Sequence, residues 1–178
     1  MKGNVIYLAG FMGAGKSTIG PILANTLGWN FYDLDRVVEK QEGKKVKEIF
    51  ESKGESYFRK VEKEVLERIS AEDKVIISLG GGTMAGEENL NFLKKTGLIF
   101  YLKASREAIY KRLKYKRDRP ALHINGDFPE TKEQLMKLID ELLTEREKYY
   151  LLSDHIILTD NIPVGKTVDE IARIISSN

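Results

Sequence analysis

The chain has 178 residues, of which 42% are hydrophobic and 31% are charged, a composition that fits one water-soluble domain with a single core. Its 29 basic and 27 acidic residues nearly cancel, which disfavours a dedicated nucleic-acid-binding protein. Because there is no cysteine, no secretory leader pattern and no apolar run long enough to span a membrane, we expect a cytoplasmic protein without disulfides or thiolate metal sites.

Short apolar runs alternate with helical patterns along the chain. Strands that alternate with helices pair in parallel and are covered on both faces, so the pattern predicts an α/β domain. Pro21 should cost the first helix one backbone hydrogen bond. Thr131 with Gln134, and Thr167 with Glu170, are candidate capping boxes for two later helices. The predicted strands cover residues 4–9, 31–34, 75–79, 98–102 and 156–159.

The segment between the first strand and the first helix reads GFMGAGKS over residues 10–17, which fits the pattern GxxxxGK[ST]. Glycines let backbone N–H groups crowd around phosphate oxygens, and the helix N-terminus adds a positive dipole. Lys16 would reach the outer phosphates, and the Ser17 hydroxyl would bind Mg²⁺. The pattern predicts a nucleoside triphosphate site, and the alternative is an idle glycine-rich turn.

Two carboxylates end the second predicted strand, at the edge of the sheet where open parallel sheets bind ligands. Asp33 and Asp35 would point to the same side if the strand continued through both. One could hold Mg²⁺ and the other could orient or deprotonate an attacking hydroxyl, although solvated turn acids are the alternative. The third strand ends in three glycines, residues 80–82, which makes Asp33 the better metal candidate; these glycines permit close ligand approach or form a flexible turn.

Two arginines lie on predicted helices. Arg59 lies near the start of a helix that begins near Phe58, with Glu62 one turn later, and by itself such a pair is usually a surface feature. Arg146 follows an apolar helical stripe at the i+4 position, which places it to point inward. A buried arginine needs an anionic partner, from the protein or from a ligand.

The basic residues concentrate between Lys111 and Arg119, where six of nine residues are basic. The irregular segment 117–130 contains two prolines and a glycine, which is typical of a lid. A basic lid over a triphosphate would neutralise charge on the transferring phosphoryl group. A nucleic-acid patch is the competing interpretation, and the balanced net charge and the lack of interleaved aromatic residues disfavour it.

Taken in order, these segments resemble the shikimate kinase family across nearly the whole chain. The resemblance implies ATP-dependent phosphorylation of the 3-hydroxyl of shikimate, with Mg²⁺ served by Ser17 and Asp33. It implies a three-layer α/β/α phosphate-loop kinase fold with a five-stranded parallel sheet of order 2-3-1-4-5. One kinase domain would span residues 1–178, with a substrate-binding region at about 33–62 and a mobile lid at about 112–130. The matching motifs are GFMGAGKST (10–18), FYDLD (31–35), GESYFRKVE (54–62), SLGGG (78–82), RDRPAL (117–122) and Arg146 before Tyr149.

For the nucleotide, the resemblance assigns most contacts to the phosphate loop. Lys16 would stabilise the transferring phosphoryl group, and Arg119 would close with the lid onto the phosphates. Arg112 would stack against adenine near residues 159–160. The ATP-binding residues implied in this way are Gly13, Ala14, Gly15, Lys16, Ser17, Thr18, Arg112 and Arg119.

For the acceptor, the resemblance implies that Asp35 contacts and activates the hydroxyl of shikimate. Arg59 and Arg146 would hold the shikimate carboxylate, and Gly81 would add a backbone contact. ATP and shikimate are then the expected partners of a monomeric enzyme that binds neither nucleic acid nor membrane. The catalytic residues implied are Lys16, Asp35 and Arg119.

Other functions remain as alternatives on the same scaffold. A gluconate-type or nucleotide kinase would share the phosphate loop, but it would not explain Asp35, Arg59, Gly81 and Arg146 as one set. A GTPase switch should carry Asn-Lys-x-Asp and Asp-x-x-Gly motifs, and the sequence has neither. A catalytically silent ATP-binding module should have lost a catalytic group.

Overall fold

A computed structural model of the chain describes residues 4–116, 120–122 and 127–177. Among these residues, no helix combines the length and the apolarity needed to cross a membrane. The elements in chain order are β1 (Val5–Ala9), α1 (Lys16–Leu27), β2 (Asn30–Asp33), α2 (Leu34–Glu42), α3 (Val46–Ile69), β3 (Val75–Ser78), α4 (Glu87–Thr96), β4 (Leu98–Lys103), α5 (Arg106–Leu113), the 3-10 helix η2 (Pro120–Leu122), α6 (Lys132–Tyr150), β5 (His155–Leu158) and α7 (Val164–Ser176).

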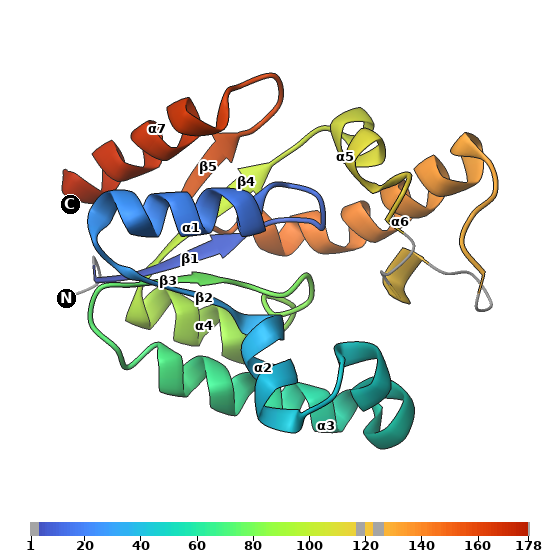
Figure 1. Cartoon of the computed structure of the whole chain (residues 1–178), viewed down its shortest axis with the longest axis horizontal. Coiled ribbons are helices and arrows are strands. Elements are labelled where there is room, and N and C mark those ends of the chain that lie inside the picture. The colour runs from blue at the N-terminus through green and yellow to red at the C-terminus, as the bar shows by residue number, and fades with distance from the viewer. Residues whose placement is uncertain (1–3, 117–119, 123–126, 178) are drawn as a thin grey trace.

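The five strands form one parallel sheet in the order β2-β3-β1-β4-β5, which confirms the predicted order. Helices cover both faces, with α1 packed against α7 on one side and α3 and α4 on the other (Figure 1). Every residue of β1 and β3 is buried, because central strands of a parallel sheet are covered twice. In the register, Asp33, Ser78 and Leu8 form one row near the carboxyl ends of the first three strands.

The second strand begins and ends one residue earlier than predicted. It ends at Asp33, and α2 begins at Leu34, so the strand does not continue through both carboxylates. Asp33 is instead the N-cap of α2, and its carboxylate accepts a hydrogen bond from the backbone N–H of Arg36 at 3.3 Å. Asp35 lies in the first turn of that helix, where the macrodipole favours an acid. The two acids therefore belong to a helix start and not to one face of a strand.

Of the two predicted capping boxes, one is present in the structure and the other is not. The Thr131–Gln134 capping box is confirmed, with bonds of 3.2 Å in both directions. The Thr167–Glu170 box is wrong, because α7 begins earlier, after Pro163, and Thr167 is buried inside it. Helix α1 runs continuously through Pro21.

The turn between α4 and β4 gives a test of the core. A Cβ atom on Gly97 would lie 2.4 Å from the carbonyl oxygen of Val5 and 2.8 Å from the Tyr7 ring. The carbonyl belongs to the central strand and cannot move aside, so we expect Gly97→Ala to lower the free energy of unfolding by about 1–3 kcal/mol or more. Urea unfolding followed by circular dichroism would measure the change.

Gly165→Ala is the matched control, since nothing lies within 4 Å of a Cβ atom at that position in α7. It should leave stability unchanged or raise it slightly, because alanine favours helix. Equal urea concentrations at the midpoint of unfolding for the two variants would contradict the packing described for Gly97.

Candidate functional site

The loop between β1 and α1 has the backbone shape expected of a phosphate-binding loop. Gly13 and Gly15 adopt φ angles of 79° and 107°, which residues with a side chain rarely adopt. Gly15 is the N-cap residue of α1 and brings no side chain to cap it. The first N–H groups of a helix have no carbonyl partner inside it, so this loop presents donors to an anion.

The polar side chains of the loop lie at the start of α1. The Lys16 ammonium donates to the carbonyls of Gly10 at 2.6 Å and Phe11 at 3.2 Å, so it lies over the loop itself. Ser17 and Thr18 are exposed. A cation and a hydroxyl beside a set of backbone donors form an arrangement suited to a triphosphate.

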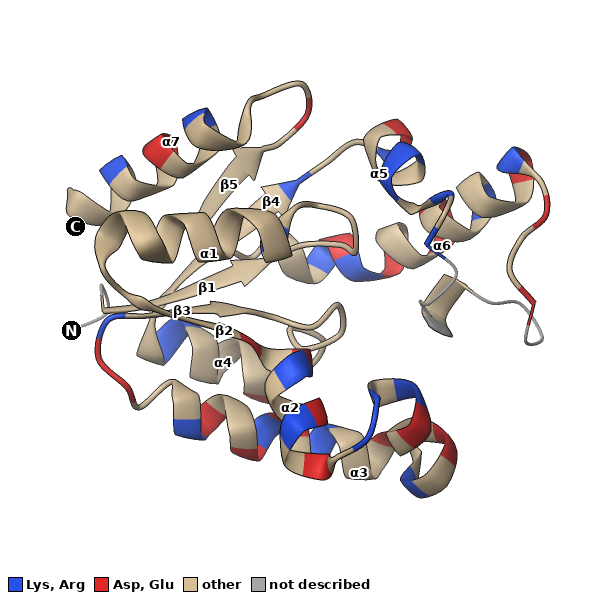
Figure 2. Ribbon diagram, viewed as in Figure 1, with Lys and Arg blue, Asp and Glu red and all other residues tan. Residues whose placement is uncertain are grey.

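Arg112 of α5 connects this loop to the end of the sheet. Its guanidinium donates to the carbonyls of Gly13 at 2.7 Å and Thr159 at 3.3 Å. The Thr159 hydroxyl in turn donates to the Ala14 carbonyl at 3.3 Å. The predicted neighbourhood of Arg112 and Thr159 beside the loop is therefore present. Figure 2 shows the basic residues of α5 at the same end of the sheet as the loop.

The glycine turn, residues 80–82, is the meeting point of the predicted acceptor residues. Cβ atoms on its first, second and third glycines would lie 2.8 Å from Asp35 Oδ1, 2.7 Å from Arg146 Nη1 and 2.6 Å from Arg59 Nη2. These side chains come from three different helices, α2, α6 and α3. A side chain at any of the three positions would displace one of these groups from the turn. The structure thus brings one carboxylate and two guanidinium groups to the end of β3.

Arg59 is held by a buried acid. Its guanidinium contacts Glu62 at 2.9 Å, and Glu62 is only 1% exposed and accepts a second bond from the Thr83 hydroxyl at 2.7 Å. Burial by itself would lower the pKa of Arg59, but the carboxylates of Glu62 and Glu55 outweigh that effect. The pKa of Arg59 is therefore raised, and the guanidinium stays charged. The surface-pair interpretation of Arg59 and Glu62 is therefore wrong.

Tyr150 is a polar residue of this region that the sequence did not single out. It is 1% exposed, and its hydroxyl donates to the Gly81 carbonyl at 2.7 Å. Burial raises the pKa of Tyr150 to about 12, so the hydroxyl keeps its proton at neutral pH. Its position one helical turn after Arg146 was the available signal, because residues four apart share a helix face.

The sequence was compared with protein families and with known proteins, and both comparisons gave matches over nearly the whole chain. The sequence profile of the family described as shikimate kinase matches residues 12–176. The chain belongs to the shikimate kinase family. The shikimate kinase of Chlorobaculum parvum is 42% identical over 170 residues, which cover 96% of this chain and 91% of that protein.

Solved structures agree with this membership. A shikimate kinase from Bacteroides thetaiotaomicron superposes with a TM-score of 0.87 at 30% identity, covering 97% of this chain and 98% of that one. A shikimate kinase from Acinetobacter baumannii, in complex with shikimate, gives a TM-score of 0.87 at 32% identity and covers 98% and 94% of the two chains.

The residues present fit the magnesium ion that the shikimate kinase family implies. Among the described residues, no group of three or more histidine, aspartate or glutamate side chains could enclose a metal. Mg²⁺ needs no such cage, since it keeps several waters and binds through one or two protein oxygens plus substrate phosphates. The half-buried Asp33, at the same sheet edge as the loop that carries Ser17, is suited to that kind of site.

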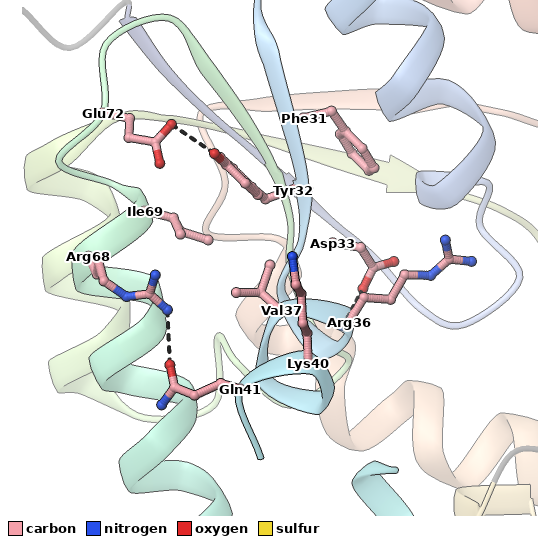
Figure 3. A pocket seen from close by; sticks show the side chains of 10 residues that line it. All are labelled: Phe31, Tyr32, Asp33, Arg36, Val37, Lys40, Gln41, Arg68, Ile69 and Glu72. Atoms are coloured by element: carbon pink, nitrogen blue, oxygen red, sulfur yellow. Dashed lines mark hydrogen bonds between the residues drawn. The ribbon is translucent and has the colours of Figure 1, made fainter. Parts of the chain in front are cut away.

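A groove of about 680 Å³ follows the outer side of β2, the edge strand of this shikimate kinase family member (Figure 3). Bonds from Tyr32 to Glu72 at 3.0 Å and from Arg68 to Gln41 at 2.9 Å tie its walls together. Of the predicted site residues that the structure describes, only Asp33 lines it. The lining residues are Phe31, Tyr32, Asp33, Arg36, Val37, Lys40, Gln41, Arg68, Ile69 and Glu72.

The predicted lid is only partly within the described residues. Arg119, and with it the RDR part of the motif, lies outside them, so its role stays a prediction. Lys111 and Arg112 lie on α5, which packs against α6. The basic segment therefore starts beside the phosphate loop, and the lid itself stays a prediction.

Proposed function

We propose that this chain transfers the γ-phosphoryl group of ATP to the 3-hydroxyl of shikimate, giving shikimate 3-phosphate and ADP. This reaction is a step in the biosynthesis of chorismate and the aromatic amino acids. One observation carries the proposal: Asp35, Arg59 and Arg146 converge on a glycine turn at the same sheet edge as the phosphate loop. Family membership and the shikimate complex of the Acinetobacter baumannii enzyme support the same substrate.

On the nucleotide side, backbone N–H groups of residues 13–18 would bind the phosphates. Lys16 would move from the loop carbonyls to the outer phosphates and stabilise the charge that develops there. Arg112 would pack against adenine, and Arg119 would approach the phosphates from the lid. Magnesium, held by Ser17 and Asp33, would neutralise phosphate charge.

On the acceptor side, Arg59 and Arg146 would hold the shikimate carboxylate. Each charge-assisted hydrogen bond contributes roughly 1.5–3 kcal/mol, which is enough to select an acid over a neutral sugar. The backbone N–H of Gly81 would add a contact between them. Asp35 would accept the proton of the 3-hydroxyl as the hydroxyl oxygen attacks the γ-phosphorus of ATP. This division of roles needs no side chain beyond the predicted set.

The domain, assembly and location predicted from the sequence belong to the same proposal. One kinase domain over residues 1–178 is supported by a single continuous core of buried residues. The substrate-binding region at about 33–62 contains Asp35 and Arg59, and the lid at about 112–130 would begin at the end of α5. We propose a monomeric, cytoplasmic enzyme that binds neither nucleic acid nor membrane.

The decisive experiment measures ADP release by purified protein with ATP and Mg²⁺. Shikimate is compared with gluconate, nucleoside monophosphates and no acceptor. Release that depends on shikimate is the expected result. Release only with another acceptor would keep a kinase and discard the shikimate assignment, and ATP binding without release would indicate the silent module.

Arg59→Ala tests the acceptor site. We expect the KM for shikimate to rise about tenfold to a hundredfold, because one charged contact to the carboxylate is lost, while the KM for ATP stays within twofold. Steady-state kinetics with each substrate varied in turn would measure both constants.

Arg68→Ala is the control for that variant, since Arg68 lies on the same helix and bonds Gln41 instead. It should leave both constants unchanged. An unaltered shikimate affinity in Arg59→Ala would remove Arg59 from the acceptor site.

A further inference from the structure

The glycine turn, residues 80–82, holds its three carbonyl groups in two different ways. The first and third accept hydrogen bonds from backbone N–H groups three residues ahead, at 3.2 and 3.0 Å. The central carbonyl, that of Gly81, accepts instead from the Tyr150 hydroxyl at 2.7 Å. The central peptide of the turn therefore depends on a side chain that belongs to α6, nearly seventy residues later in the chain.

That dependence matters because glycine has little conformational preference of its own. The peptide planes on either side of Gly81 meet at its α-carbon, so rotation of one plane alters the surroundings of the other. The Gly81 N–H is the backbone group proposed to contact the substrate. The bond from the Thr83 N–H to the Gly80 carbonyl holds the plane that carries the Gly81 N–H, and the bond from the Tyr150 hydroxyl holds the other plane, so the two bonds together keep the Gly81 α-carbon in place.

Tyr150 also lies beside Arg146. The two residues are four apart on α6 and share a helix face. A Cβ atom on Gly81 would lie 2.7 Å from Arg146 Nη1 and 3.9 Å from the Tyr150 hydroxyl oxygen, so both groups pack against the same α-carbon. The Arg146 guanidinium partly offsets the rise that burial causes in the pKa of Tyr150, which is consistent with their proximity.

The ring of Tyr150 is itself held in place. It is buried and packs against the Tyr101 ring, with centroids 5.2 Å apart. The Tyr101 hydroxyl donates to a different partner, the Glu147 carboxylate, at 3.2 Å. A hydroxyl on a fixed ring is a precise anchor for a flexible turn.

We propose that Tyr150 is a positioning residue for the substrate carboxylate: its hydroxyl holds the Gly81 peptide and the Arg146 guanidinium in a fixed relation to each other. The inference rests on the proposed function, and it adds a residue that touches the binding groups without touching the substrate. It requires that removing one oxygen atom weaken acceptor binding selectively.

The test compares Tyr150→Phe with Tyr101→Phe, which removes the same atom from the neighbouring buried ring. For Tyr150→Phe we expect the KM for shikimate to rise about fivefold to tenfold, the size typical of one lost hydrogen bond, with the KM for ATP within twofold. For Tyr101→Phe both constants should stay within twofold. Thermal unfolding of each variant, with and without ATP, shows whether the variant is folded at the assay temperature.

A second measurement is independent of how much of each variant is folded. The ratio of kcat/KM for shikimate to that for its carboxamide reports recognition of the carboxylate alone. We expect Tyr150→Phe to lower this ratio about fivefold, because Arg146 loses its fixed position, and Tyr101→Phe to leave it unchanged.

The outcomes separate the two proposals. If the unmodified protein releases no ADP in the presence of shikimate, the proposed function fails and this inference fails with it. If the unmodified protein is active but Tyr150→Phe keeps its shikimate KM and its carboxamide ratio, only the positioning role is overturned. A parallel rise in both KM values with an unchanged ratio would likewise overturn it, since that is the mark of general loosening.

Discussion

Asp35→Asn should lower kcat for shikimate phosphorylation by about 10² to 10⁴-fold, the range that a positioned general base contributes. The asparagine keeps the shape of the side chain beside the glycine turn, but it cannot take the hydroxyl proton. The KM for ATP should stay within twofold, since the phosphate loop is untouched. Single-turnover measurements with saturating ATP and shikimate would give the rate of the chemical step directly.

The control must allow for the position of Asp35 in the first turn of a helix, where loss of negative charge costs about 0.3–1 kcal/mol of stability. Glu87→Gln makes the corresponding change in the exposed first turn of α4. It should reproduce the small loss of stability and leave kcat unchanged. Turnover of shikimate by Asp35→Asn at the parent rate would show that Asp35 does not activate the hydroxyl.

Lys16→Met has the second largest expected effect, a fall in kcat of about 10² to 10³-fold. The ammonium would stabilise charge on the transferring phosphoryl group, and methionine keeps the length of the chain without that charge. The KM for ATP should also rise, because the same ammonium holds ground-state phosphates. Steady-state kinetics and direct titration of ATP separate the two effects.

The Lys16 ammonium also bonds the carbonyls of Gly10 and Phe11, so the variant could alter the loop as well as the charge. Lys166→Met, in the exposed first turn of α7, is the control for loss of a lysine near a helix start. It should behave as the parent protein. A Lys16→Met enzyme with kcat within twofold of the parent would contradict the role given to Lys16.

Short local patterns were sufficient for part of the site. The phosphate loop is contiguous, so its glycines, Lys16 and Ser17 could be recognised without any knowledge of the fold. The helix start around Asp33 was misjudged because the apolar run continues one residue past the strand, to Leu34, which is the first residue of α2. The box at Thr167 failed for a similar reason, since Pro163 begins the helix a turn earlier.

The remaining contacts of the site depend on distance in space. Whether Arg59 belonged to the surface or to a site could not be decided from its spacing to Glu62, because burial of that acid follows from packing around β3. For Tyr150 the sequence offered only its spacing of four residues from Arg146, which does not name a partner. Its partner, the Gly81 carbonyl, lies on a turn far away in the sequence.

The sequence by itself determined the alternation of strands and helices, the phosphate loop and, through ordered motifs, the family. Those features rest on local hydrophobic periods and on residue types at fixed spacing, which a chain carries whatever its tertiary fold. Only the tertiary structure decided that Asp35, Arg59 and Arg146 lie against one glycine turn, and that the Tyr150 hydroxyl bonds its central carbonyl. Those contacts join elements that the packed core brings together, and their distances depend on how α2, α3 and α6 seat against the sheet.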